Sequence, residues 1–217
     1  MTSPLPARVG ILLSGRGSNF LALHAAMVRG EVPAEVALVL SNLAGVGGLE
    51  RARDLGLPTA CVAAADFADR TAQEEAMVEV LRGAGVEWIC LAGFMRLLGP
   101  RFLRAFPHRV LNIHPSLLPA FPGLHAQRQA IAHGVRVSGC TVHFVDEGLD
   151  SGPIVMQRTV PVLDEDDEEA LAARILVEEH QAYPEALRRL LTEDWSVDGR
   201  RVRFGGVVAA APQAARG

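Results

Sequence analysis

The sequence predicts an α/β fold: one domain with a Rossmann-like, mostly parallel sheet that carries helices on both faces. The first half of the chain alternates short apolar runs, such as Arg8–Leu13 and Ala34–Leu40, with helical patterns. Strands that are buried on both faces read as such apolar runs, and their alternation with helices indicates βαβ units. In the second half, 135–145 alternates in the manner of a strand, and 153–162 is a further extended run. We therefore expect the sheet to be mixed at its C-terminal end.

The elements are expected in a fixed order along the chain. Strands are predicted at 8–13, 34–40, 58–62, 86–91, 109–113, 135–145 and 153–162. Helices are predicted at 20–29, 46–55, 70–82, 100–105 and 125–133, and in an apolar pattern that follows the acidic stretch 164–169 and runs to about 191. The pair Asp198-Gly199 indicates a final hairpin turn. One domain is expected over 1–206, and the patternless tail 207–217 is expected to be disordered.

Composition and charge exclude several classes of function. The 217 residues have a formal net charge of −4, which argues against a general nucleic-acid binder. All 21 basic residues are arginines, so a mechanism that needs a catalytic lysine is excluded. Cys61, Cys90 and Cys140 are scattered and lie in or beside apolar runs, which predicts buried, reduced thiols. Neither the cysteines nor the histidines form a close group of ligands, so no metal site is expected.

The same composition bears on location and partners. No apolar run reaches the roughly 20 residues that span a bilayer, and the N-terminal residues lack a charged leader followed by a long apolar stretch. We therefore expect a cytoplasmic protein that contacts neither membrane nor nucleic acid. Its partners are expected to be small-molecule substrates, and its state a monomer or homodimer.

A glycine-rich turn, Ser14–Asn19 (SGRGSN), joins the first strand to the first helix. Glycines let the backbone approach an anion closely, and a helix N-terminus offers unpaired N–H donors. The dinucleotide pattern G-x-G-x-x-G fails because Phe20 stands at its third glycine position. The second strand also ends at Ser41-Asn42, without an acidic residue for a ribose hydroxyl. The turn therefore favours a phosphomonoester over NAD, with an ordinary tight turn as the alternative.

The most informative segment is the end of the predicted fifth strand, Asn112-Ile113-His114, followed by Pro115. Residues i and i+2 of a strand share a face, so Asn112 and His114 project together at the ligand-binding edge of the sheet. Two hydrogen-bonding groups held rigidly there can polarise a carbonyl and stabilise the oxyanion that it becomes. An isolated histidine at such a position is more often structural.

A second polar segment, the loop Asp146–Pro153, carries Asp150 between two extended runs. A carboxylate near an imidazole favours the charged imidazolium, which can donate to an oxyanion or act as a general acid. An aspartate in a glycine-rich loop is usually a turn former. The loop alone therefore leaves the role of Asp150 open.

Four segments together carry a resemblance to a known family: SGRGSN (14–19), LAGFMRLL (91–98), NIHPSLLPAFPG (112–123) and VHFVDEGLDSGPI (142–154). In this order and spacing they resemble the folate-dependent glycinamide ribonucleotide formyltransferases of purine biosynthesis, over about residues 8–192. The elements NIHPSLLP (112–119) and DSGP (150–153) are shared by the wider formyltransferase family, which includes methionyl-tRNA formyltransferases and formyltetrahydrofolate hydrolases. The first turn is what resembles the glycinamide ribonucleotide branch, where it holds the ribose phosphate.

The resemblance implies a formyltransferase fold and transfer of the formyl group of 10-formyltetrahydrofolate to the amine of 5'-phosphoribosylglycinamide, without a metal. It implies that Asn112, His114 and Asp150 are catalytic. The phosphorylated amine would be contacted by Gly17, Ser18, Asn19, Pro115 and Glu179, with Glu179 near its ribose. The folate would be bound by Arg70, Met95, Arg96, Leu97, Leu98, Asn112, Val145, Asp146 and Asp150.

Three alternatives compete with this interpretation. A formyltetrahydrofolate hydrolase would release formate without an amine acceptor. A non-catalytic nucleotide- or folate-binding module would keep the fold without turnover, although the intact Asn112, His114 and Asp150 set argues against it. An NAD-dependent dehydrogenase is disfavoured by Phe20 and the missing acidic residue. The sequence also lacks a G-x-S-x-G elbow, so acyl transfer is expected to proceed without a protein nucleophile.

Overall fold

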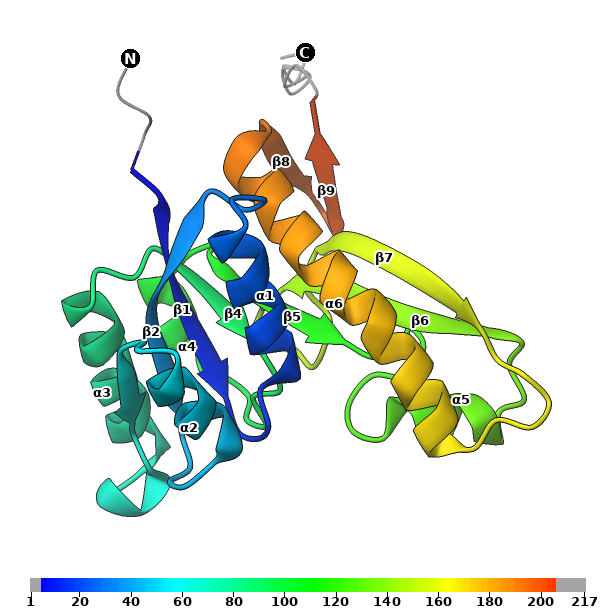
Figure 1. The fold of residues 1–217 in the computed structure, drawn as a ribbon, viewed down its shortest axis with the longest axis horizontal. Helices are drawn as coiled ribbons and strands as arrows, with labels where there is room; N and C mark the ends of the chain where they lie inside the picture. Colours follow the sequence, from blue (N-terminus) through cyan, green and yellow to red (C-terminus); the bar gives the residue numbers. More distant parts are fainter. Residues whose placement is uncertain (1–4, 206–217) are drawn as a thin grey trace, which may run out of the picture.

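The computed structural model describes residues 5–205, which form one sheet flanked by helices (Figure 1). The strands are β1 (Ala7–Leu13), β2 (Ala34–Ser41), β3 (Thr59–Cys61), β4 (Trp88–Leu91), β5 (Val110–His114), β6 (Val137–Phe144), β7 (Ile154–Pro161), β8 (Trp195–Asp198) and β9 (Arg201–Phe204). In the described residues their order across the sheet is β3-β2-β1-β4-β5-β6-β7-β9-β8. The predicted disorder of 207–217 concerns residues outside the described range.

The helices occupy the positions that the sequence predicts. They are α1 (Ser18–Val28), α2 (Gly47–Asp54), α3 (Arg70–Gly83), α4 (Pro100–Ala105), α5 (Ala126–Ala132) and α6 (Glu168–Thr192), with a short 3-10 helix η1 (Ala64–Asp66) that was not predicted. Helix α1 begins at Ser18 rather than Phe20, directly after Gly17 in the left-handed conformation. The acidic stretch does form a helix start, since the Asp167 carboxylate accepts from the Ala170 N–H and caps α6.

The parallel half of the sheet forms the edge at which ligands are expected to bind. Strands β1, β2, β3, β4 and β5 pair in parallel, so their carboxyl ends meet at one edge. Strand β1 has β2 on one side and β4 on the other, so the chain reverses its direction across the sheet here. Ligands of open α/β sheets bind outside the carboxyl ends at such a reversal. The predicted polar residues Asn112 and His114 end the neighbouring strand β5.

The C-terminal half makes the sheet mixed, as predicted. Strand β6 pairs antiparallel with both β5 and β7, and in the first pairing His143 lies opposite Asn112 and Thr141 opposite His114. Strands β8 and β9 form the predicted final hairpin: Asp198 ends β8, and Gly199 and Arg200 form the turn. This hairpin joins the sheet through one parallel pair between β9 and β7.

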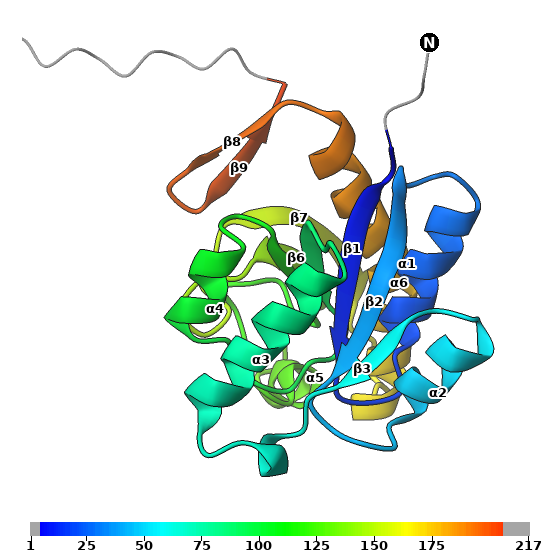
Figure 2. The ribbon, with the colours of Figure 1, turned by 90° about the vertical axis from the view of Figure 1, so that its left-hand side faces the viewer.

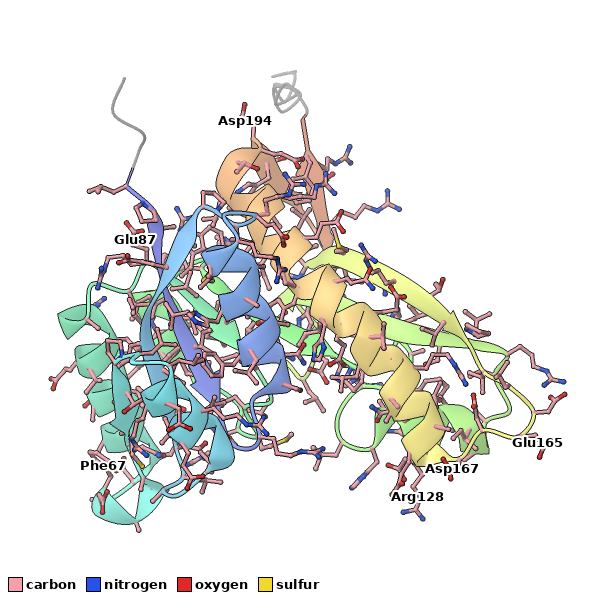
Figure 3. The ribbon with its side chains drawn as sticks, in the orientation of Figure 1. Phe67, Glu87, Arg128, Glu165, Asp167 and Asp194 are labelled. Carbon is pink, nitrogen blue, oxygen red and sulfur yellow. The ribbon has the colours of Figure 1, made fainter. Side chains whose placement is uncertain are left out.

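Helices cover both faces of the sheet, again as predicted (Figure 2). One core contains Phe20 and Leu23 of α1, Leu49 of α2 and Leu187 of α6, packed with the strands. The opposite core contains Met77 and Leu81 of α3 and Phe102 of α4, together with other strand residues. Charged side chains such as Glu87, Arg128 and Asp194 point outward from this framework (Figure 3). Each face of the sheet is thus covered by an apolar cluster, and burial of apolar surface is the dominant favourable term in folding.

Tyr183 of α6 braces the centre of the sheet. Its side chain is fully buried, and its hydroxyl lies 3.1 Å from the Leu91 carbonyl oxygen and 3.0 Å from the Leu111 carbonyl oxygen. The single hydroxyl proton is therefore shared between the ends of β4 and β5. Burial raises the pKa of Tyr183 well above its ordinary value, so the hydroxyl stays protonated. Leu91 is the last residue of β4, and Leu111 directly precedes Asn112 within β5.

The prediction of three buried cysteines is right for two and wrong for one. Cys90 and Cys140 are buried, and burial raises the pKa of each thiol to about 12. Cys61 is exposed because it lies at the end of β3, a short strand at the edge of the sheet. No helix in 5–205 combines the length and apolar character needed to cross a membrane.

Candidate active site

The loops after β4, β5 and β6 surround a cavity of about 520 Å³ at the carboxyl edge of the sheet. Its lining residues include the polar set Asn112, His114, His143, Asp146 and Asp150. They also include a mainly apolar set, Leu91, Phe94, Met95, Leu97, Leu98, Leu124, Val145 and Leu149. A volume of this size and a few convergent polar groups in apolar walls are typical of small-molecule sites, which measure roughly 300–1,000 Å³.

Asn112 is oriented by a histidine on the neighbouring strand. Its Nδ2 lies 3.3 Å from Nε2 of His143, and Nδ1 of His143 lies 2.9 Å from the carbonyl oxygen of Phe144. Because the carbonyl can only accept, Nδ1 of His143 donates to it and Nε2 accepts from Asn112. Burial lowers the pKa of His143, against smaller effects from the Phe144 carbonyl and from Asp150. The buried ring is therefore held neutral and fixes the Asn112 amide.

His114 places both of its ring nitrogens against oxygen acceptors. It is 5% exposed, and its Nε2 lies 2.9 Å from the carbonyl oxygen of Phe121. Its Nδ1 faces a carboxylate oxygen of Asp150 at 3.4 Å. Nε2 therefore donates to the Phe121 carbonyl, and Nδ1 faces the carboxylate at the cavity.

Asp150 is held by the loop that follows β5. Its Oδ2 accepts from the Gly123 backbone N–H at 2.8 Å, and its Oδ1 lies 3.8 Å from Nε2 of His143. The residue adopts a left-handed conformation with φ 49°, which aspartate tolerates better than most residues. The structure therefore brings the three predicted catalytic side chains together from β5 and a loop more than 30 residues later.

The loop around Asp150 is closed by its own contacts. Asp146 accepts through Oδ1 from the Gly148 N–H at 3.1 Å and from the Ser151 hydroxyl at 2.7 Å. A Cβ atom at Gly152 would lie 1.9 Å from the Phe144 carbonyl oxygen, so only glycine fits there. These contacts fix the direction in which the loop presents Asp150.

The predicted folate residues divide into two groups. Those that line the cavity are Met95, Arg96, Leu97, Leu98, Asn112, Val145, Asp146 and Asp150. Met95 and Leu97 are 68% and 55% exposed, which leaves apolar surface open at the cavity wall. Arg70 is not among the residues that line the cavity. Its guanidinium instead pairs with Glu74 one turn along α3, with Nε and Oε1 2.6 Å apart.

The predicted acceptor residues form a neighbouring group around the glycine turn. Asn19 donates through Nδ2 to a carboxylate oxygen of Glu179 at 2.7 Å, which joins the start of α1 to α6. Both residues are buried, and burial raises the pKa of Glu179 although the Asn19 contact opposes this. Oδ1 of Asn19 is buried and has no partner in the described residues. Pro115 lines the cavity itself.

The turn and the cavity share a wall. The Met95 N–H donates to the Ser14 hydroxyl at 3.0 Å, and the Ser14 N–H donates to the Gly93 carbonyl at 3.0 Å. The loop after β1 is thus tied to the loop after β4, which lines the cavity.

Sequence reasoning missed His143, Phe121 and Gly123, whose contacts orient the three polar side chains. A signal for His143 was present: Thr141 and His143 are polar residues two apart in β6, so they share one face of the strand. The pairing with Asn112 depends on the register of β6 against β5, which a sequence pattern leaves open. Phe121 and Gly123 contribute only a backbone carbonyl and a backbone N–H, which a sequence pattern does not reveal.

The fold and the site define a class of protein. The chain matches the family model described as Formyl transferase over residues 7–187, and it therefore belongs to the formyl transferase family. The phosphoribosylglycinamide formyltransferase of Escherichia coli is 41% identical over 190 residues, which cover 88% of this chain and 87% of that protein. The solved structure of glycinamide ribonucleotide transformylase 1 from Symbiobacterium toebii matches with a TM-score of 0.91 and 50% identity, over 93% of this chain and 95% of that one.

A longer relative contains the same unit as part of a larger protein. The trifunctional purine biosynthetic protein adenosine-3 of Drosophila pseudoobscura pseudoobscura is 51% identical over 193 residues. The match covers 88% of this chain but only 14% of that protein. The chain thus corresponds to a small part of the trifunctional relative and to most of the bacterial one.

Proposed function

We propose that the chain transfers the formyl group of 10-formyltetrahydrofolate to the amine of 5'-phosphoribosylglycinamide, a step of de novo purine biosynthesis. The observation that carries the proposal is the convergence of Asn112, His114 and Asp150 on one wall of a cavity that adjoins the glycine turn. The relatives named as phosphoribosylglycinamide formyltransferases support the same acceptor. A formyl donor and a phosphorylated amine would then meet where the two loops share a wall.

The chemistry is a direct acyl transfer. The acceptor amine attacks the formyl carbon, a C–N bond forms, and the carbonyl electron pair moves onto oxygen. Asn112 lies two residues from His114 on the same strand, so their N–H groups can face this oxygen together. The C–N bond to the folate nitrogen then breaks as the oxygen electron pair re-forms the carbonyl. The proton lost by the attacking amine ends on the folate nitrogen, so the products are formylated amine and tetrahydrofolate.

Asp150 acts on His114 in this proposal. Its carboxylate faces Nδ1 at 3.4 Å and is held in place by the Gly123 N–H. A nearby negative charge favours the imidazolium, which stabilises an oxyanion better than the neutral ring does. Asp150 also lines the cavity, so it can hold a water molecule that moves the proton from the amine to the leaving nitrogen.

The two substrates use different parts of the site. The folate ring system occupies the cavity with Met95, Leu97, Leu98 and Val145 as apolar walls, and Arg96 and Asp146 lie beside it. Arg70 pairs with Glu74 through Nε and does not line the cavity, so its contact with the folate glutamate stays a prediction. The acceptor binds with its phosphate at Gly17, Ser18 and Asn19 and its ribose near Glu179, and Pro115 borders both substrates.

The decisive test is a formyl-transfer assay with purified protein. With both substrates present, formylated acceptor and tetrahydrofolate are expected in equal amounts. Release of formate in the absence of acceptor, at the same rate as with it, would instead identify a formyltetrahydrofolate hydrolase. Tight binding of both substrates without turnover would identify a non-catalytic binding module. Sedimentation of the same sample decides between the expected monomer and homodimer.

A further inference from the structure

Helix α2 contacts the glycine turn from behind, on the two carbonyl groups at its tip. The Gly48 N–H donates to the Gly15 carbonyl at 3.0 Å. The next carbonyl, that of Arg16, accepts from Nη1 of Arg51 at 3.1 Å. Two consecutive carbonyl groups of the turn are therefore bound by one helix.

The contact is close enough to require glycine on both sides. A Cβ at Gly17 would lie 3.2 Å from Cα of Gly48, and Gly17 itself has φ 74°, where side chains are strained. A Cβ at Gly48 would lie 2.9 Å from the Gly15 carbonyl oxygen and closer still to the Leu13 side chain. The turn and the start of α2 thus pack backbone against backbone.

The N–H donors of the turn, unlike its two carbonyl groups, are left for a ligand. The backbone N–H groups of Gly17, Ser18 and Asn19 have no acceptor among residues 5–205. They belong to the N-terminus of α1, an 11-residue helix, where unpaired donors attract anions. Asn19 provides a second observation of a ligand, because it is 8% exposed and its Oδ1 has no partner in the described part of the chain; as an acceptor, this oxygen suits a hydroxyl group of the phosphorylated ligand.

Charge also gathers at the turn. Arg51 contacts no carboxylate in the described structure, and the same holds for Arg16, which is exposed at the tip of the turn. The sequence contains no lysine, so positive charge near the turn must come from arginine. A guanidinium that holds a carbonyl of the turn also raises the electrostatic potential at the amide groups on its other side.

We propose that Arg51 is a positioning residue for the phosphomonoester of the acceptor, because it fixes the turn through the Arg16 carbonyl and adds positive charge behind it. Gly48 completes this support from the same helix. The inference rests on the proposed function, and it assigns to α2 the part of acceptor binding that the residues of the turn cannot supply alone. Arg51 acts through the turn and does not touch the reacting atoms.

The test compares Arg51→Ala and Arg51→Gln with Arg53→Ala, a matched control that removes an exposed arginine from the same helix. Steady-state kinetics give the KM of the acceptor, the KM of the folate and kcat. Binding of inorganic phosphate is measured by calorimetry, and thermal unfolding monitors stability. For the Arg51 variants, acceptor KM and phosphate Kd are expected to rise about tenfold, as for loss of one charged hydrogen bond. Folate KM and kcat should stay unchanged, and Arg53→Ala should match the parent protein.

Several outcomes would overturn the inference. Unchanged acceptor KM and phosphate Kd in folded Arg51→Gln would show that α2 plays no part in anion binding. A parallel loss of folate affinity, kcat and thermal stability would show a general structural role. If Arg51→Ala does not fold, Arg51→Lys should fold and recover part of the phosphate affinity, because it keeps the charge; affinity as weak as that of Arg51→Gln would contradict the proposal.

The outcomes also separate this inference from the proposed function. If the parent protein binds inorganic phosphate with the expected dependence on Arg51 but transfers no formyl group, the function fails and the inference stands. If the parent protein transfers formyl groups and the Arg51 variants bind phosphate equally well, the inference fails and the function stands.

Discussion

Asn112 and His143 form one hydrogen-bonded pair across the boundary between the parallel and antiparallel halves of the sheet. The amide Nδ2 of Asn112 donates to Nε2 of His143 over 3.3 Å, and His143 is only 2% exposed. An isolated asparagine could present either end of its amide to a substrate, whereas this pairing selects one. His143 thereby determines which group of Asn112 faces the cavity.

Replacement of His143 should therefore reduce turnover through Asn112. In His143→Phe the amide loses its acceptor, and we expect kcat to fall about tenfold or more while both KM values change little. The variant His143→Gln offers a carbonyl oxygen and should retain more of the activity. Equal activities of the two variants in a steady-state assay would argue against an orienting role.

The proposed catalytic residues give the largest expected effects. His114→Asn or Asp150→Ala should lower the rate of formyl transfer by about 10²–10³, the usual cost of losing an oxyanion donor or the group that supports it. Circular dichroism and thermal unfolding confirm that each variant is folded. Near-parent activity in either folded variant would show that the assignment is wrong.

Stability should depend on pH through His143. Burial lowers its pKa below the ordinary 6.5, so an unfolded chain takes up a proton at a pH where the folded protein does not. As far as His143 is concerned, the free energy of unfolding is therefore highest above about pH 6.5 and decreases as the pH falls below this value. His180, whose pKa burial also lowers, adds to the same trend. Urea unfolding between pH 5 and 8 measures the slope, which His143→Gln should make shallower; an unchanged slope would contradict this prediction.

Replacement of Glu179 should raise the stability of the protein and weaken its binding of the acceptor. Burial raises its pKa, so the stability that it contributes is present below the ordinary value of 4.5 and is lost as the pH rises through the folded value. At neutral pH, Glu179→Gln should therefore stabilise the protein, since an amide oxygen can still accept from Asn19. The same variant should raise the acceptor KM if Glu179 binds ribose hydroxyls. Denaturant unfolding and kinetics check the two effects, and a destabilised variant would contradict the first.

Removal of the Tyr183 hydroxyl tests the brace between β4 and β5. Tyr183→Phe leaves two buried carbonyl groups without this donor and should cost about 1–3 kcal/mol of unfolding free energy. Because Leu91 ends β4 beside the cavity and Leu111 directly precedes Asn112 in β5, kcat should also fall modestly. Urea unfolding gives the first quantity and the formyl-transfer assay the second. Parent-like stability would mean that the strand ends are held by other contacts.

Much of this fold could be predicted because its physical causes are local. Apolar runs gave the strands, and the acidic stretch before α6 indicated a helix start that Asp167 indeed caps. The spacing of Asn112 and His114 was sufficient to place both on one face of β5. The prediction that Cys61 is buried was wrong, because the sequence does not show which strand lies at the edge of the sheet.

The rest of the site depends on contacts between distant segments. Asp150 reaches His114 only after β6 has crossed back beside β5, and the resemblance rather than a pattern suggested that meeting. The Asn112–His143 pair depends on strand register, which has no local signal. Arg70 illustrates the opposite case, since its local partner Glu74, four residues on, occupies the guanidinium that the resemblance assigns to the folate.

Helix α6 makes two of the contacts that position the site, and both come from neighbouring turns of the helix. Glu179 contacts the start of α1 while Tyr183, four residues later on the same helix, contacts the ends of β4 and β5. The separation between the acceptor residues and the strands that carry Asn112 is thus set by about 6 Å of helix, slightly more than one turn. An insertion or deletion of one residue between 179 and 183 would rotate one contact off its target by about 100°. Insertions and deletions should therefore be tolerated in the loops of this protein far more readily than in this segment of α6.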